Sequence, residues 1–546
     1  MKSLAIIAIS LLAAVNAANV TFKVVAPDAK KQVQVQVDGK LVNLKAADPD
    51  VPYYTGTADL QGKNYKYIVD GKAENFDRSF DGGDATKNDY YSRKVTYATN
   101  IPKLPTALSD GAWDKAERNH PIWDDNYIPT IFVTGDQNDM NDLIENVPKT
   151  TYKTKVTFIG PDDVYKFEDV SLGLHRPGRK NNDAKQSWIW ALPEDQFLGG
   201  RNWFKLRHME EDPTQLREKL YADIAENIGT YVGSANMVRL FVNKEGMGTF
   251  NMLDDILKYS YINAMFYGDG YTSFTPNIES PLTADDIAPF SEALAKVDFK
   301  DDAQVQATAQ YFDYDQFLRL MAMEFLTGSW DAYWIEQTND GAYIDLDEKK
   351  LYYLAQDFDA TFGVNLDDTI DPNHEFGKST VDDWIKKFPK AWLIQKYLSN
   401  PTIKATFNQY VQEIHEKIFN YDTLSKVVEA RHNFYAPDLQ WDRSIKQRSP
   451  GNVFGWTFQQ TKDNLYQGVS APGGSGGGAA YGLLEWVKQR DEALGGNVKT
   501  SKKVEEATTA SMLAAKEDYA TSGALKTTAP KMLAGLAAAG AAAALL

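Results

Sequence analysis

The chain contains no cysteine among its 546 residues, although its first residues are typical of a secreted protein. Met1–Ala17 carries one lysine, an apolar run from Leu4 to Val15 and a small-residue ending, which is the pattern of a secretory signal peptide. Secreted proteins commonly gain stability from disulfides, and this chain cannot form any. Its stability must therefore come from a large hydrophobic core, for which 43% hydrophobic and 12% aromatic residues are sufficient. Thiolate zinc sites and thiol catalysis are excluded.

The charge of the chain argues against nucleic acid as a partner. The formal net charge is -17, and a surface of this sign repels a phosphate backbone. Histidine-based metal sites and catalytic triads are also disfavoured, because the six histidines are scattered without a pair at metal-ligand spacing. They are His120, His175, His208, His374, His415 and His432.

Two covalent modifications are predicted at the ends of the mature chain. The sequon Asn19-Val20-Thr21 makes Asn19 an acceptor for N-glycosylation. At the other end, small residues from Ser522 to Ala524 precede a short spacer and an apolar tail from Met532 to Leu546, which is the pattern of GPI attachment at Ser522. Such a lipid would anchor the secreted protein to the plasma membrane or cell wall at the cell surface. The alternatives for the tail are an alanine-rich helix packed on the body and a short tail anchor.

Residues 18–105 alternate apolar and polar side chains as strands do. Two alternating runs, Val33–Val37 and Tyr65–Val69, each lead into an Asp-Gly pair, at Asp38-Gly39 and Asp70-Gly71, which is a hairpin signal. We expect a small antiparallel β-sandwich. Its second hairpin resembles those of immunoglobulin-like modules beside carbohydrate-active domains, so glycan binding stands as an alternative to a role as a structural spacer.

A larger domain is expected over residues 106–500, with strands first and helices later. The predicted strands include Thr130–Thr134, Thr154–Ile159, Tyr165–Leu174, Trp188–Leu192, Asn202–Met209 and Met237–Asn243. The predicted helices are Asp212–Ile228, Phe312–Leu326, Ala391–Leu398, Thr402–Ile418 and Tyr481–Leu494. The predicted order is a group of strands with one helix among them, followed by a segment made mainly of helices. This order predicts an α+β domain of two lobes.

The residues most suited to chemistry are carboxylates between Gly328 and Gly363. Asp331 follows a predicted helix, and Asp357-Phe358-Asp359 follows the predicted strand Leu351–Leu354. Carboxylates on connected loops can hold a divalent metal and orient a hydroxyl group. Asn339, between them, offers a carbonyl oxygen to the same metal. Together these segments predict a centre for phosphoryl transfer.

The same segments carry a resemblance to a known family. The succession Gly328-Ser329-Trp330-Asp331, then Asn339–Tyr343, then Asp357–Gly363 resembles the catalytic segment of the CotH family of spore-coat kinases. The resemblance extends over residues 130–495 and implies a bilobal, protein-kinase-like domain. The expected organisation is a signal peptide (1–17), a β-sandwich (18–105), a CotH kinase-like domain (106–500), a stalk (501–523) and a GPI-attachment propeptide (524–546).

The resemblance also implies roles for particular residues. Asp331 would be the base or hydroxyl-orienting residue, and Asn339 with Asp357 or Asp359 would bind metal. Glu218 would pair with a phosphate-binding lysine, which is either Lys185 or Lys205. ATP and Mg²⁺ would be the cofactors of an active enzyme.

Each of these residues has a simpler alternative role. Asp331 is also a suitable helix cap, and Asn339 is a suitable turn residue. Glu218 with either lysine would form an ordinary ion pair.

Two functions are compatible with these observations. One is a secreted kinase that phosphorylates serine or threonine of a protein substrate with ATP and Mg²⁺. The other is a surface ligand, because fungal relatives in this family are GPI-anchored invasins that bind host-cell receptors. Their recognition segment is similar to the stretch Gln337, Thr338, Asn339, Asp340, Gly341, Ala342 and Tyr343, which we expect to form an exposed loop. We favour an adhesin or invasin built on a kinase-like domain.

Overall fold

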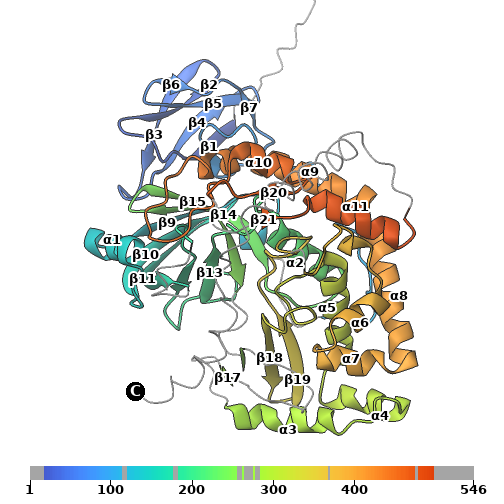
Figure 1. Ribbon diagram of the computed structural model, residues 1–546. Coiled ribbons are helices and arrows are strands. Elements are labelled where there is room, and N and C mark those ends of the chain that lie inside the picture. The colour runs from blue at the N-terminus through green and yellow to red at the C-terminus, as the bar shows by residue number, and fades with distance from the viewer. Residues whose placement is uncertain are drawn as a thin grey trace, which may run out of the picture. The chain divides into compact units, whose positions relative to one another are not determined.

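The computed structural model describes residues 18–113, 120–175, 183–254, 261–262, 275–276, 283–366, 369–473 and 478–496. The chain divides into two units, Met1–Lys499 and Thr500–Leu546, and the described residues all belong to the first. The predicted signal peptide, stalk and GPI segment with Ser522 lie outside them. The described unit is a mixed α+β structure (Figure 1). None of the helices in this described part is long and apolar enough to cross a membrane.

The first eight strands form one antiparallel-rich sheet, in the order β6-β5-β2-β3-β4-β1-β8 with β7 beside β5, and only two residue pairs join β3 to β4. Strand β3 continues the sheet by pairing with β2 and then with β4. The predicted Asp-Gly turns are confirmed, since Asp38, Gly39, Asp70 and Gly71 all have positive φ, as the tight turn of a hairpin requires. The strands are β1 (Ala18–Val25), β2 (Val33–Val37), β3 (Lys40–Ala46), β4 (Tyr53–Leu60), β5 (Asn64–Val69), β6 (Lys72–Ala73), β7 (Arg78–Ser79) and β8 (Asp89–Tyr90).

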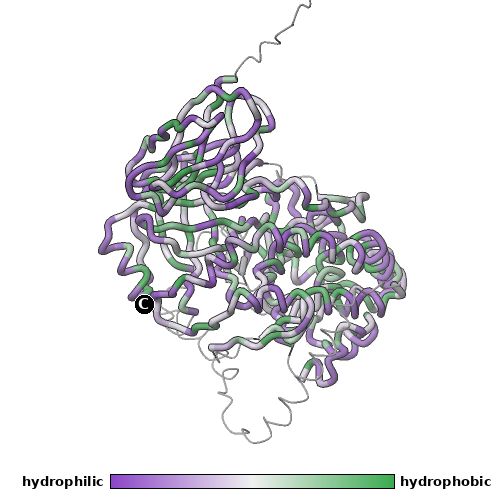
Figure 2. The backbone as a smooth tube through the Cα atoms, turned by 90° about the horizontal axis from the view of Figure 1, so that it is seen from above, coloured by the Kyte–Doolittle hydropathy of each residue, from purple (hydrophilic) through white to green (hydrophobic). Residues whose placement is uncertain are grey.

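Seven further strands close into a barrel in the order β10-β11-β12-β13-β15-β14-β9. Their alternate side chains, among them Trp188, Trp190 and Phe204, fill the interior. Hydrophobic and hydrophilic residues alternate over short distances along the backbone (Figure 2). The strands are β9 (Thr130–Thr134), β10 (Tyr152–Ile159), β11 (Val164–Leu174), β12 (Trp188–Ala191), β13 (Trp203–Arg207), β14 (Ala235–Val242) and β15 (Glu245–Asp254), and they confirm the predicted strands of this region.

Helices dominate the second half of the described unit, as predicted. A hairpin of β18 (Asp340–Asp345) and β19 (Lys350–Ala355) lies among them and pairs with β16 (Tyr261–Ile262), which pairs with β17 (Thr275–Pro276). Two short strands, β20 (Val469–Ser470) and β21 (Gly478–Ala479), form a second small sheet. The helices are α1 (Gln137–Asn146), α2 (Arg217–Asn227), α3 (Ala284–Ala295), α4 (Asp302–Ala307), α5 (Tyr314–Thr327), α6 (Val381–Lys387), α7 (Trp392–Leu398), α8 (Pro401–Lys417), α9 (Tyr421–Asp442), α10 (Phe458–Asp463) and α11 (Leu483–Ala493).

Helix α2 begins later than predicted, at Arg217 instead of Asp212. The Asp212 carboxylate accepts hydrogen bonds from the backbone N–H groups of Leu216 and Arg217, both at 2.8 Å. Gln215 has a φ of 54°, which is incompatible with a right-handed helix. Asp212 therefore acts from outside the helix and satisfies its first free N–H groups.

The longest described helix, α9 with 22 residues, was not predicted. Its buried face includes polar residues such as Arg431, His432 and Asp438, and Pro437 lies within it. Buried polar groups weaken the periodic apolar pattern on which the prediction of helices depends. They are satisfied by tertiary ion pairs, such as that of Arg431 with Asp223.

Candidate functional site

Strand β13 presents two cations on one face. Lys205 and Arg207 are two residues apart, so their side chains point to the same side of the strand. The intervening Leu206 and the preceding Phe204 point the other way, into the barrel core. Both cations are largely buried, at 8% exposure each. A buried charge needs a partner, and Arg207 finds its partners in the segment after β19.

The partners of Arg207 are the two aspartates of Asp357-Phe358-Asp359. One guanidinium nitrogen lies 2.7 Å from Asp357 Oδ1, and another lies 2.8 Å from Asp359 Oδ2. Asp357 has a φ of 66°, so the chain turns directly after β19 and both carboxylates reach the same arginine. Burial raises the pKa of Asp359, and Arg207 opposes this effect.

Helix α2 contributes a third carboxylate. Glu218 is 3% exposed, and its Oε2 accepts a hydrogen bond of 2.9 Å from the backbone N–H of Phe358. Tyr221, one turn further along α2, stacks on the Phe358 ring with centroids 3.8 Å apart. Burial, followed by the charges of Asp359 and Asp357, raises the pKa of Glu218 to about 8. The helix is therefore attached to the aspartate segment through both backbone and side chain.

The three carboxylates fit the requirements of a divalent cation. Glu218, Asp357 and Asp359 each offer an oxygen, and these oxygens lie within 4.8 Å of one another. Oxygen ligands of Mg²⁺ or Ca²⁺ lie about 2.0 to 2.6 Å from the ion, so ligands on opposite sides of it are about 4 to 5 Å apart. Arg207 shares two of the same carboxylates, so a cation would compete with its guanidinium group.

Two glycines allow the loops of this site to approach the helices. Gly328 ends α5 with a φ of 60°, and a Cβ there would lie 2.3 Å from Trp486. Gly363 has a φ of 82°, and a Cβ there would lie 2.5 Å from Tyr481. Both the left-handed conformation and the close approach require glycine.

Asp331 lies in a second cluster with Thr338 and Asn339. Its carboxylate accepts hydrogen bonds of 2.7 Å from Thr338 Oγ1 and from Asn339 Nδ2. The backbone carbonyl of Asn339 accepts a hydrogen bond from the backbone N–H of Gln356, and Gln356 precedes Asp357. Asp331 and Asn339 are thus brought together, and the backbone of Asn339 joins them to the aspartate segment.

The two candidate lysines occupy different places. Lys205 lines a cavity of about 40 Å³ with Glu218, Asp357 and Phe358. Lys185 lies elsewhere, because its Nζ contacts Asp442 Oδ1 at 2.6 Å and the Thr249 carbonyl at 2.7 Å. The structure therefore brings Lys205, and not Lys185, to Glu218.

The expectation that Gln337–Tyr343 forms an exposed loop is wrong. Asp340–Tyr343 belongs to strand β18, which pairs along its length with β19. Gln337 is 5% exposed, while Asp340 and Ala342 are fully buried. The polar composition of the segment is typical of a turn, but pairing with an apolar strand overrides it. Tyr343, at 41% exposure, is its most accessible side chain.

Two residues at the centre were not predicted from the sequence. Arg207 contacts both aspartates. The signal that could have identified Arg207 is its position two residues after Lys205 on the same predicted strand, which places both side chains on one face. Burial, followed by the charge of Asp359, raises the pKa of Glu211 to about 7. Its carboxylate accepts a hydrogen bond of 3.3 Å from Asn365 Nδ2. No local pattern in the sequence indicates that Glu211 lies near this cluster.

Two further acids are buried behind the site. Asp340 forms no side-chain hydrogen bond with the described residues, and burial raises its pKa to about 7. Glu324 of α5 accepts hydrogen bonds from the Trp334 N–H and the Tyr353 hydroxyl, and burial raises its pKa to about 8. Burial therefore disfavours the ionised form of both carboxyl groups.

The buried Asp340 predicts that the protein loses stability as the pH rises. The folded-state pKa lies above the ordinary value of 3.8, so this contribution is present at low pH and is lost between about pH 4 and pH 7. Asp340→Asn removes the titration. We compare the free energy of unfolding of the variant with that of the parent by urea unfolding. The difference between them should change in favour of the variant by on the order of 3 kcal/mol as the pH rises from about 4.5 to about 8.

Asp347→Asn is the matched control, because Asp347 lies on the exposed turn of the same hairpin. Its pH profile should follow that of the parent. An Asp340→Asn profile parallel to the parent profile would show that Asp340 does not titrate in this range.

Comparison with known proteins identifies the family. Residues 178–467 match the family model of the CotH kinase protein. The chain is 58% identical to spore coat protein homolog 1 of Rhizopus delemar over 93% of this chain and 86% of that protein. It is 59% identical to invasin CotH7 of the same fungus, over 88% and 84% of the two chains, and 45% identical to invasin CotH3, over 90% and 87%. The resemblance predicted from the aspartate motifs is confirmed, and the chain belongs to the CotH kinase protein family.

Proposed function

We propose that this protein is a cell-surface invasin that contacts host cells through its kinase-like domain. The observation that carries the proposal is the extended similarity to proteins named invasins, at 45–59% identity over 88–90% of the chain. The predicted signal peptide and GPI attachment at Ser522 would bring the chain to the cell surface. N-glycosylation at Asn19 is compatible with passage through the secretory pathway.

The proposal includes an arrangement of the domains. The barrel with α2 corresponds to the first lobe of a kinase, and the helices from α5 onward correspond to the second. The first eight strands cover the residues of the predicted β-sandwich and form one connected sheet. This division is supported by the position of Glu218 and Lys205 on the barrel side and of Asp331 and Asn339 after α5.

The surface most suited to a host receptor is the tip of the β18–β19 hairpin. Most of the predicted recognition segment is buried, but Tyr343 is 41% exposed and Leu346, in the turn, is 63% exposed. Exposed aromatic and aliphatic side chains close together are suitable anchors for a protein partner. We therefore place receptor binding at the exposed end of the segment.

The receptor proposal predicts that truncating both side chains weakens host-cell binding. Tyr343→Ala with Leu346→Ala should reduce binding of the recombinant secreted chain to cultured host cells by about tenfold, because the anchors are removed while the hairpin backbone is kept. The matched control is Leu41→Ala, which removes a side chain of 54% exposure from β3. Equal binding by parent and double variant would exclude the hairpin tip.

A second candidate function is phosphoryl transfer with ATP and Mg²⁺. The specific observation is the convergence of Lys205, Glu218, Asp357 and Asp359 at one place. Lys205 would bind phosphate, and Asp357 or Asp359 would bind the metal together with the Asn339 carbonyl oxygen. Asp331 would orient the hydroxyl group of a protein substrate. Since the cavity beside Lys205 holds about 40 Å³, it fits an ion or a water, and nucleotide binding would require the site to open.

The nucleotide proposal predicts that Mg²⁺ with ATP raises the melting temperature of the secreted chain. A ligand at about a hundredfold its Kd stabilises the folded state by about 2.7 kcal/mol. The shift should be lost in Lys205→Met and in Asp357→Asn. Lys185→Met should keep it, although its own baseline melting temperature falls because Asp442 loses its buried partner.

The opposite pattern, a shift lost in Lys185→Met and kept in Lys205→Met, would reassign the lysine. A parent protein that shows no shift would leave the kinase-like domain as a binding scaffold only.

A further inference from the structure

A cavity of about 460 Å³ lies away from the carboxylate cluster, between the first strands, the barrel and helix α9. Its walls include the loops around Glu74 and Ser92, residue Phe241 of β14 and Trp441 of α9. This volume is in the range of cavities that hold small molecules. The proposed functions above make no use of it.

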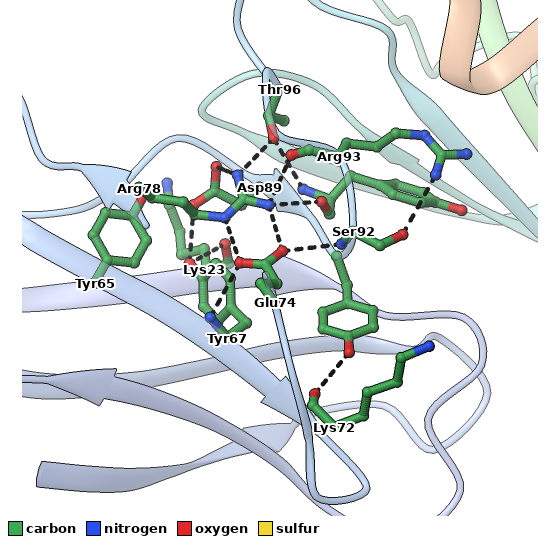
Figure 3. Close-up of polar contacts among 12 residues, drawn as sticks. Lys23, Tyr65, Tyr67, Lys72, Glu74, Arg78, Asp89, Ser92, Arg93 and Thr96 are labelled. Carbon is green, nitrogen blue, oxygen red and sulfur yellow. Dashed lines mark hydrogen bonds and ion pairs between the residues drawn. The ribbon is translucent and has the colours of Figure 1, made fainter. Parts of the chain in front are cut away.

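A buried ionic network holds two of these walls together (Figure 3). Arg78 contacts Glu74 at 2.7 Å and Asp89 at 3.1 Å, with all three side chains at most 7% exposed. Glu74 accepts a hydrogen bond of 2.9 Å from the Ser92 N–H. Arg78 donates to the Tyr90 and Arg93 carbonyls. The loop that carries Glu74 is thereby attached to the loop of residues 90–93 at several points.

The third wall is attached by a second ion pair. Arg93 Nε donates to Asp438 of α9 at 3.0 Å, and Arg239 of the barrel donates to the same carboxylate at 2.7 Å. The Arg239 guanidinium group also lies 4.1 Å from the centre of the Tyr90 ring. Trp441, one turn beyond Asp438, stacks on Phe241 with centroids 5.3 Å apart. These contacts attach α9 both to the loop of residues 90–93 and to the barrel.

Stability alone does not explain so many buried charges. Replacing a buried ion pair by packed apolar side chains is often neutral or stabilising. The network instead fixes the positions of the side chains that border the cavity, as the supporting residues of binding sites do. A preorganised wall reduces the entropy that a ligand loses on binding.

The lining indicates the class of ligand. Three partly exposed aromatic side chains, Phe76, Tyr91 and Trp441, border the cavity. Asp28 and Lys72 lie at its exposed rim with opposite charges, and the buried charges are paired, so the site favours a neutral ligand. A sugar ring offers one face of C–H groups for aromatic packing and a rim of hydroxyl groups for the polar side chains.

A peptide is a less suitable occupant. Peptides that add to a sheet need a long free edge, and β6, the strand at this edge, has two residues. We propose that this cavity is a binding site for a neutral oligosaccharide, with Phe76, Tyr91 and Trp441 as the stacking surfaces.

The test is calorimetric titration of the secreted chain with four probes, namely maltohexaose, cellohexaose, chitohexaose and mannopentaose, each to about 1 mM. At least one should bind. Trp441→Ala and Phe76→Ala should each weaken that binding by about tenfold or more, with circular dichroism confirming that they fold. Phe197→Ala is the matched control, because Phe197 is 57% exposed and lies outside the cavity.

The two variants change different segments of the lining, the loop after β6 and helix α9, so a folding defect in one leaves the other informative. Absence of binding by all four probes would overturn the proposal. So would binding that both cavity variants retain, or binding that Phe197→Ala loses equally. Capture of a defined peptide in this cavity, with no saccharide bound, would replace the proposal by peptide recognition.

Discussion

The guanidinium group of Arg207 lies between two carboxylates that would repel each other without it. The side chains of Asp357 and Asp359 are 8% and 3% exposed, and one residue separates them. Their shared partner is fixed on a barrel strand, so the turn after β19 is held against β13. The remaining features of the site depend on this turn, because the Phe358 N–H reaches Glu218 and the Phe358 ring reaches Tyr221 of α2.

The same arrangement concentrates acids in a buried region. Glu218, Glu324 and Asp340 all have pKa values raised to about 7 or 8, in each case chiefly by burial. Burial disfavours the ionised form of all three groups, and within the described residues only Glu218 has nearby cations, Arg207 and Lys205, that oppose this effect. A divalent cation would oppose it further at the cluster of Glu218, Asp357 and Asp359. We therefore expect a divalent cation and the Arg207 guanidinium group to compete for Asp357 and Asp359.

Local sequence patterns predicted the strands and the order of the aspartate motifs well. Alternation and Asp-Gly turns depend on neighbours in the chain, so the hairpin at Asp38-Gly39 could be predicted without tertiary information. The choice between Lys185 and Lys205 could not, because it depends on Asp442, more than 200 residues away in the chain. Helix α9 and the burial of Asp340 escaped prediction for the same reason, since tertiary contacts outweigh local composition there.

We propose that the carboxylates joined by Arg207 form a divalent cation site. The most direct measurement is anomalous diffraction from crystals of the secreted chain soaked in Mn²⁺. We expect an anomalous peak about 2.1 Å from oxygens of at least two of Glu218, Asp357 and Asp359, with the Arg207 guanidinium group moved away from the carboxylates it contacts. A map with no peak at this cluster, and with both Arg207 ion pairs intact, would contradict it.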